Sequence, residues 1–106
     1  MEQTTPDFNP KDLFDISVVS GIADYQEITD KNRYLYKKAD KVFLVINPHT
    51  IELRTDGELK KLLTDKYESV MESRYFGRGG IEIVPAGQLS YDELADLVRL
   101  SYNLTN

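Results

Sequence analysis

Hydrophobic and polar residues follow two different periods along the chain, and the change between them separates a strand-rich part from a helix-rich part. Ile51 and Leu53 alternate with Glu52 and Arg54, which is typical of a strand with one buried face. Closely spaced segments with strand character predict an antiparallel meander: 22–28, 33–37, 42–46 and 50–55. The third of these is apolar at every position, which is typical of a central strand covered on both faces.

Later apolar residues recur at the three- and four-residue spacing of a helix, in segments 56–70 and 90–106. Each segment opens with a capping-box pattern, in which Thr or Ser is followed three residues later by Glu. A Gly-rich turn at 77–80 and a strand at 81–84 lie between them. We therefore predict an α+β fold, an antiparallel sheet of about five strands with two main helices packed on one face.

The N-terminal residues are predicted to form a loose tail and the start of the domain. Residues 1–8 are polar, so the single domain is expected to span 9–106. A short helix is predicted to begin at Asn9, with Pro10 at its first helical position. As an alternative, residues 16–19 already extend as a strand.

Composition narrows the chemistry that the chain can carry. Its 106 residues suit one domain, and the absence of cysteine excludes disulfides and thiolate sites. The apolar runs are far too short to span a membrane, and the N-terminus has no signal-peptide pattern, so we expect a cytoplasmic protein. Residues 1–30 hold seven acids and one base, a net charge of −6, which is more negative than the net charge of −5 for the whole chain. The body of the domain is therefore close to neutral.

The order and spacing of these elements resemble the MmcQ/YjbR-like family. Residues 50–55 lead into a helix with an acidic start and a Leu62-Leu63 pair, as in the middle of those proteins. Residues 89–102 resemble their closing helix, and the resemblance covers roughly 34–104. It implies a compact α+β domain in which β-hairpins project like wings, a shape from which DNA binding has been proposed.

The chain departs from that family in two places. Many members have a longer N-terminal helix, which only residues 9–15 could supply here. Many also carry His and Trp before the last strand, whereas residues 74–81 contain neither. The resemblance therefore implies a fold, and no role tied to those residues is carried over.

A basic stretch forms the first candidate site, because five cations fall within eleven residues and tyrosines interleave with them. In a hairpin, Arg33 and Lys37 share one face, while Tyr34, Tyr36 and Lys38 share the other. Such a surface could follow a phosphate backbone. The alternative is a solvated hairpin whose lysines discourage edge pairing. The candidate residues are Lys31, Arg33, Tyr34, Tyr36, Lys37, Lys38 and Lys41.

The second candidate is the glycine-rich segment that contains Gly77, Gly79 and Gly80. Consecutive glycines can bring backbone amides together around an anion, with Arg74 and Arg78 reaching a phosphate from a second wing tip. No Gly-Lys-Ser/Thr follows, so the segment is not a P-loop. The alternative is a tight turn that needs a positive φ.

Other polar residues are explained without a catalytic or metal site. His49 stands alone in a turn, where we expect it to be exposed. Asp92 and Glu93 fit the start of a helix, where the helix dipole favours acids. Tyr75 could join Tyr34 and Tyr36 in an exposed aromatic patch, or these tyrosines could pack at the edge of the core.

The sequence therefore favours a non-enzymatic binding module, with nucleic acid, and DNA in particular, as the leading partner. A protein-interaction or self-associating (homodimeric) domain is the alternative, through a sheet edge or the tyrosines. A small-ligand binder or enzyme that uses the glycine turn is the third. We expect no cofactor, no metal and no membrane partner.

Overall fold

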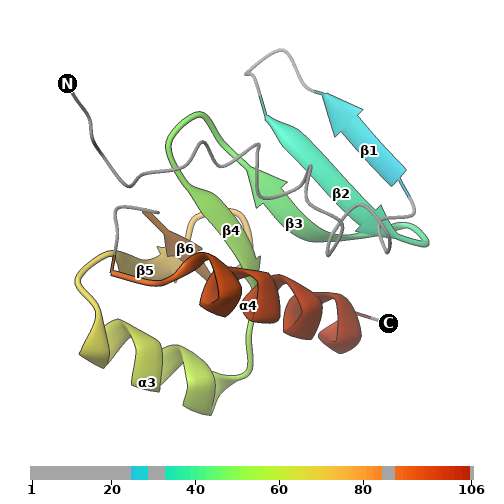
Figure 1. The fold of residues 1–106 in the computed structure, drawn as a ribbon. Coiled ribbons are helices and arrows are strands. Elements are labelled where there is room, and N and C mark those ends of the chain that lie inside the picture. Colours follow the sequence, from blue (N-terminus) through green and yellow to red (C-terminus); the bar gives the residue numbers. More distant parts are fainter. Residues whose placement is uncertain (1–24, 29–32, 85–87, 106) are drawn as a thin grey trace, which may run out of the picture.

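A computed structural model describes residues 25–28, 33–84 and 88–105, and it confirms the α+β class (Figure 1). One sheet of six antiparallel strands has the order β1-β2-β3-β4-β6-β5. The tail at 1–8, the helix at 9–15 and Lys31 lie outside the described residues. The elements are β1 (Tyr25–Ile28), β2 (Tyr34–Lys38), β3 (Lys41–Ile46), β4 (Ile51–Arg54), α3 (Gly57–Lys66), β5 (Val70–Ser73), β6 (Gly77–Ile83) and α4 (Tyr91–Leu104).

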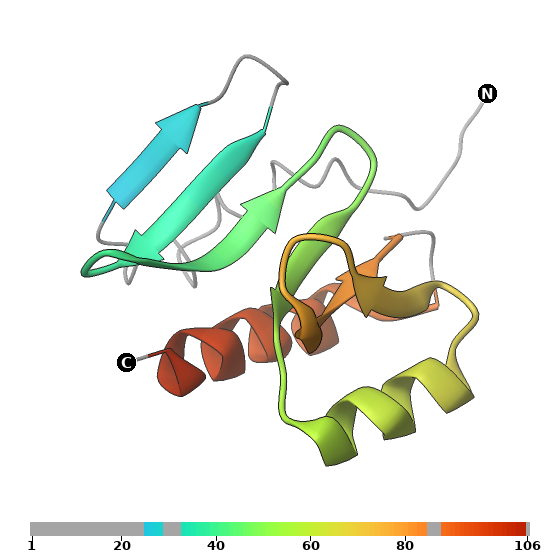
Figure 2. The ribbon, with the colours of Figure 1, turned by 180° about the vertical axis from the view of Figure 1, so that it is seen from behind.

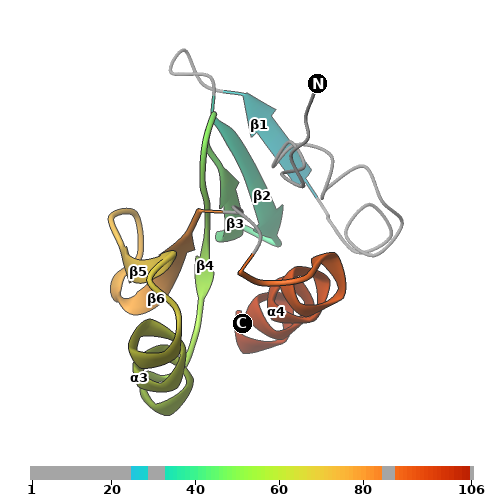
Figure 3. The same ribbon diagram turned by 60° about the vertical axis from the view of Figure 1, so that its left-hand side comes forward.

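Both helices pack on the same side of the sheet. α4 contacts β3 and β4, and α3 contacts β5 and β6 (Figure 3). The strand registers place the buried side chains of neighbouring strands opposite one another, Leu44 to Leu53 to Ile81 and Ile51 to Ile83. We call the side of the sheet that carries these buried residues the helix face. Because alternate residues of a strand point to opposite sides, the residues between them lie on the other side, which we call the back face. Seen from behind, β4 crosses in front of α4 (Figure 2).

Side-chain caps begin both helices, but the predicted Thr55/Glu58 capping box of the first is replaced by Asp56, whereas the predicted box of the second is confirmed. Asp56 accepts a 2.7 Å hydrogen bond from the amide of Leu59 at the start of α3. Ser90 and Glu93 form a reciprocal capping box at the start of α4. These bonds satisfy amides that the first helical turn leaves without partners. Within the described residues, neither helix combines the length and the apolar character needed to cross a membrane.

The predicted helix at 56–70 was too long. α3 ends at Lys66, and Tyr67 is already extended. Val70 lies at a helical spacing from the leucines of α3, but it begins β5 and pairs with Ile83 in the buried sheet. Strand pairing in the core outweighs the local periodicity, which adds a strand to the expected sheet.

The glycine-rich turn was also misplaced by a few residues. Residues 74–76 make the turn, and Gly77, with a φ of +63°, begins β6. Gly80 lies within the strand, where a Cβ would stand 2.5 Å from the carbonyl oxygen of Leu53 and 2.7 Å from the Cβ of Phe76. Gly77 thus supplies the positive φ that was expected, while Gly80 makes room for Phe76 against the sheet.

Ser101 fastens α4 to the central strands. Its hydroxyl donates a 2.6 Å hydrogen bond to the carbonyl oxygen of Phe43 and accepts a 2.8 Å bond from the amide of Arg54. The side chain is fully buried. One small polar residue therefore joins α4 to both β3 and β4.

Candidate functional site

The back face of the sheet carries several of the cations that the sequence singled out. The strand registers create a row across this face, in which Leu35 faces Val45, Val45 faces Glu52, Glu52 faces Glu82 and Glu82 faces Met71. Strand alternation adds basic residues on either side of that row. The cations that the described residues place on the back face are Arg33, Lys37, Arg54 and Arg74. Arg78 lies instead on the side of α3, where its carbonyl oxygen accepts a 3.3 Å bond from Lys60 and where Lys60 and, more weakly, the charge of Arg78 lower the pKa of Glu72.

The basic hairpin divides between the two faces of the sheet. Arg33 and Lys37 share the back face with Leu35, as predicted. Tyr36 is only 1% exposed and belongs to the core, so the expectation that it contacts a ligand is wrong. Tyr34 also packs against the core. Packing within the core explains Tyr36, and packing at its edge explains Tyr34.

Lys38 is occupied in holding the end of α4. Its ammonium donates a 3.1 Å hydrogen bond to the carbonyl oxygen of Tyr102 and lies 4.5 Å from the centre of that ring. A cation near the final carbonyls of a helix is favoured by the helix dipole. Lys41, another of the predicted hairpin cations, is by contrast exposed beside the β2–β3 turn. Lys38 is thus better explained as a structural residue than as a ligand contact.

Arg74 is fixed on the back face by a two-pronged ion pair. Its Nε and Nη2 atoms donate hydrogen bonds of 3.0 and 2.6 Å to the two carboxylate oxygens of Glu82. The Arg74 side chain remains 71% exposed, whereas that of Glu82 is buried. The planar guanidinium is therefore held in one orientation while its other N–H donors face outward.

The pKa of Glu82 reflects this arrangement. Burial raises the pKa of the carboxyl, but hydrogen bonds from Arg74 and Thr50 and the charge of Arg74 outweigh burial. The pKa of Glu82 is therefore held below its usual value. The carboxylate stays ionised at neutral pH and keeps Arg74 in place.

Glu52, directly opposite Glu82, is completely buried and fully hydrogen-bonded. One carboxylate oxygen accepts bonds from the Ser73 hydroxyl at 2.7 Å and the Tyr75 amide at 2.8 Å. The other accepts a 2.8 Å bond from Nδ2 of Asn47. Asn47 belongs to the β3–β4 turn, Ser73 ends β5 and Tyr75 lies in the β5–β6 turn, so Glu52 ties the two turns together.

This polar network connects the two sites that the sequence treated as separate. Arg33 donates a 3.1 Å bond to Oδ1 of Asn47, which in turn bonds Glu52. The path therefore runs from the start of β2 to the β5–β6 turn. Sequence alternation placed Glu52 on the polar face of its strand and gave no sign that it is buried. No local motif marks Asn47 or Glu82 as its neighbours.

The glycine segment does not form the predicted ring of converging amides. The Gly79 amide donates to the carbonyl oxygen of Phe76, and Gly80 lies opposite Arg54 in the strand ladder. The guanidinium of Arg54 lies 4.9 Å from the centre of the Phe76 ring. The glycines thus shape the backbone around Phe76. His49 is exposed in its turn, as expected.

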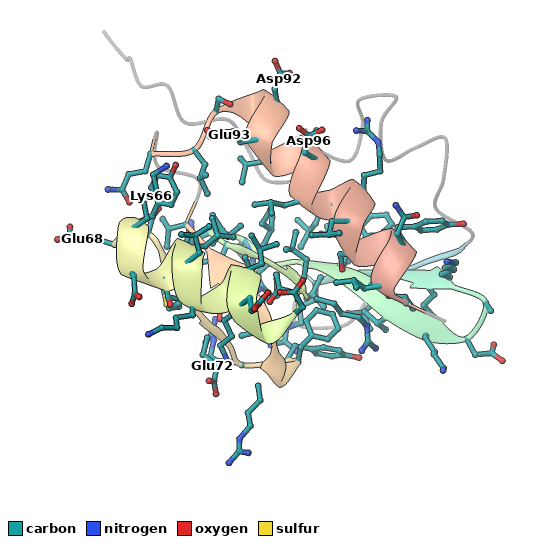
Figure 4. The ribbon with its side chains drawn as sticks, turned by 90° about the horizontal axis from the view of Figure 1, so that it is seen from below. Lys66, Glu68, Glu72, Asp92, Glu93 and Asp96 are labelled. Atoms are coloured by element: carbon teal, nitrogen blue, oxygen red, sulfur yellow. The ribbon has the colours of Figure 1, made fainter. Side chains whose placement is uncertain are left out.

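The helix side of the molecule has the opposite charge character. Exposed acids on and beside α3 and α4 outnumber the cations there, several of which are paired, as Lys61 is with Asp65 and Arg99 with Asp96 (Figure 4). These exposed acids are Asp56, Glu58, Asp65, Glu68, Glu72, Asp92, Glu93 and Asp96. Among the described residues, the two acids of the back face are buried instead.

No protein-family model and no curated protein matches this chain. Among solved structures, the crystal structure of protein DR2400 from Deinococcus radiodurans is similar, with a TM-score of 0.79 and 18% sequence identity. The match covers 96% of this chain and 81% of that one, which is described as carrying a DUF419 domain. DUF419 is a YjbR/MmcQ-like family. At this identity, the likeness shows the fold alone.

Proposed function

We propose that this protein binds nucleic acid, DNA in particular, through the back face of its sheet. The observation that carries this proposal is the separation of charge between the two sides of the molecule. Four cations from separate strands and turns share the back face, while exposed acids gather on the helix side. Nucleic-acid binding proteins draw most of their affinity from cations placed along the phosphate backbone.

The chemistry of the back face suits a phosphate backbone in two further ways. Arg74 presents an oriented, exposed guanidinium. Glu52 and Glu82 lie beneath the surface, so their carboxylates do not stand among the groups that a phosphate would meet. Tyr75 is 42% exposed in the same turn and packs edge-to-face on Phe76, which would leave it available to stack on a base.

Fluorescence anisotropy with short single- and double-stranded DNA and RNA, titrated with salt, tests this proposal. We expect micromolar or tighter binding that weakens steadily as salt is added. For duplex DNA, the slope of log K against log salt should correspond to about three to five phosphate contacts, at roughly −0.9 for each. Absence of binding at low salt would contradict the proposal. A cytoplasmic location and membership of the MmcQ/YjbR-like family stay predictions from the sequence.

A further inference from the structure

An apolar groove separates the two helices on the side opposite the proposed nucleic-acid face. α3 and α4 run antiparallel, so that the C-terminal end of α3 lies at the same end as the N-terminal end of α4 (Figure 1). The groove between them has a volume of about 380 Å³. Its leucines include Leu59, Leu62, Leu97 and Leu100. Leu62 is 60% exposed, the highest value among the large hydrophobic residues that the structure describes as exposed.

One end of this groove is acidic. Glu93 and Asp96 line it from α4, and Lys66 lines it from α3 (Figure 4). Asp92 and Glu68 are exposed at the same end. We call Glu68, Asp92, Glu93 and Asp96 the acidic rim. Four acids stand here against Lys66 and Arg99, which pairs with Asp96, so this end of the groove keeps an excess of negative charge that attracts cationic side chains.

We propose that the groove between α3 and α4 binds an amphipathic helix of a partner protein, with leucine-like side chains on one face and lysine or arginine at the end that meets the acidic rim. A helix that binds in a groove contacts it through apolar side chains at spacings of three and four residues. α3 has ten residues and is therefore about 15 Å long. The groove thus accommodates about three turns of partner helix.

The charge of the rim distinguishes this occupant from two others. A second copy of the chain would bring an identical acidic rim. Among the residues that line the groove, Lys66 is the single cation that could pair with those acids. The segment 1–30 of this chain carries seven acids and one base, so it is also poorly matched to the rim. A basic partner satisfies both the leucines and the acids.

NMR titration of the full-length, ¹⁵N-labelled protein with two model peptides tests this inference. One peptide is an amphipathic helix of leucine and lysine, and the other has glutamate in place of each lysine. We expect the leucine–lysine peptide to shift amides within 57–67 and 89–100, to bind at least about tenfold more tightly than its acidic counterpart, and to weaken with salt. Equal binding of both peptides, shifts elsewhere in the chain, or no shifts would overturn the proposal.

Two matched leucine variants separate the groove from general surface hydrophobicity. Leu62→Glu should weaken the leucine–lysine peptide by at least about tenfold, because it places a charge among the apolar contacts. Leu104→Glu changes an exposed leucine of α4 that does not line the groove, and it should bind as the wild type does. Equal effects of the two variants would contradict the assignment. A concentration-dependent mass that Leu62→Glu abolishes would assign the groove to a second copy instead and overturn the proposal.

Discussion

Glu52 and Glu82 lie directly opposite each other on neighbouring antiparallel strands, and both side chains are almost completely removed from solvent. Two facing carboxylates would repel each other without compensation. Here, donors from both adjacent turns surround them, and Arg74 adds a charge. The pair therefore acts as the internal support of the back face, because the donors that satisfy it also fix the two turns.

Replacing Glu52 by alanine should destabilise the fold strongly. The substitution leaves the Asn47 side chain and the Tyr75 amide without their buried acceptor, at a cost of about 1–3 kcal/mol for each such group. Glu52→Gln keeps an acceptor oxygen and the side-chain volume, so we expect a smaller loss. Urea unfolding of both variants measures the two free energies. Equal losses for both variants would contradict the acceptor role of Glu52.

The two adjacent glycines of β6 should respond differently to alanine. At Gly80 a Cβ would meet the carbonyl oxygen of Leu53 at 2.5 Å and Phe76, so Gly80→Ala should cost about 1–3 kcal/mol through forced displacement. At Gly79 the nearest atom to a Cβ is 3.8 Å away, so Gly79→Ala should be tolerated. Thermal unfolding of the two proteins compares them directly. A wild-type melting temperature for Gly80→Ala would show that Phe76 does not lie where the structure places it.

Loss of the Ser101 hydroxyl should weaken the attachment of α4. Ser101→Ala leaves the Arg54 amide and the Phe43 carbonyl without their buried partner, and we expect a loss of about 1–3 kcal/mol. Thr64→Ala is the control, because the Thr64 hydroxyl bonds only carbonyls of its own helix. Amide hydrogen exchange along α4 should accelerate in Ser101→Ala alone. Unchanged exchange there would exclude Ser101 as the fastening residue.

Protonation of Glu82 in acid should lower the free energy of unfolding. Its pKa in the folded protein is lower than the ordinary value of 4.5, so its contribution is complete above that pH and is lost as the pH falls through the folded pKa. Glu82→Gln lacks this contribution. The melting temperatures of wild type and variant should therefore differ by a constant amount above about pH 5 and converge below 4.5. A difference that does not change with pH would contradict the assigned pKa shift.

The sequence predicts the elements whose signals are local. The start of α4 is set by a capping box that involves Ser90 and Glu93, and the central strand β3 is apolar throughout. Val70 was misassigned because its helical spacing is a local pattern, whereas its pairing with Ile83 depends on a distant strand.

The candidate site was predicted in part for the same reason. Arg33 and Lys37 share a face because strand alternation is local. Lys38 contacts Tyr102, 64 residues away, and no local pattern reports that contact. The burial of Glu52 likewise depends on turns that are distant in sequence, so alternation identified its face but not its environment.

The most direct test of the proposed function compares two charge reversals of equal size on opposite sides of the molecule. The first variant, Arg33→Glu/Lys37→Glu, reverses two cations of the back face, and the second, Lys61→Glu/Lys66→Glu, reverses two cations of α3. Anisotropy with a fluorescent DNA duplex at fixed low salt measures the affinity of each, after circular dichroism confirms that both fold. We predict at least about a tenfold loss for the back-face variant and near-wild-type binding for the α3 variant. Equal losses, or a greater loss for the α3 variant, would contradict nucleic-acid binding through the back face.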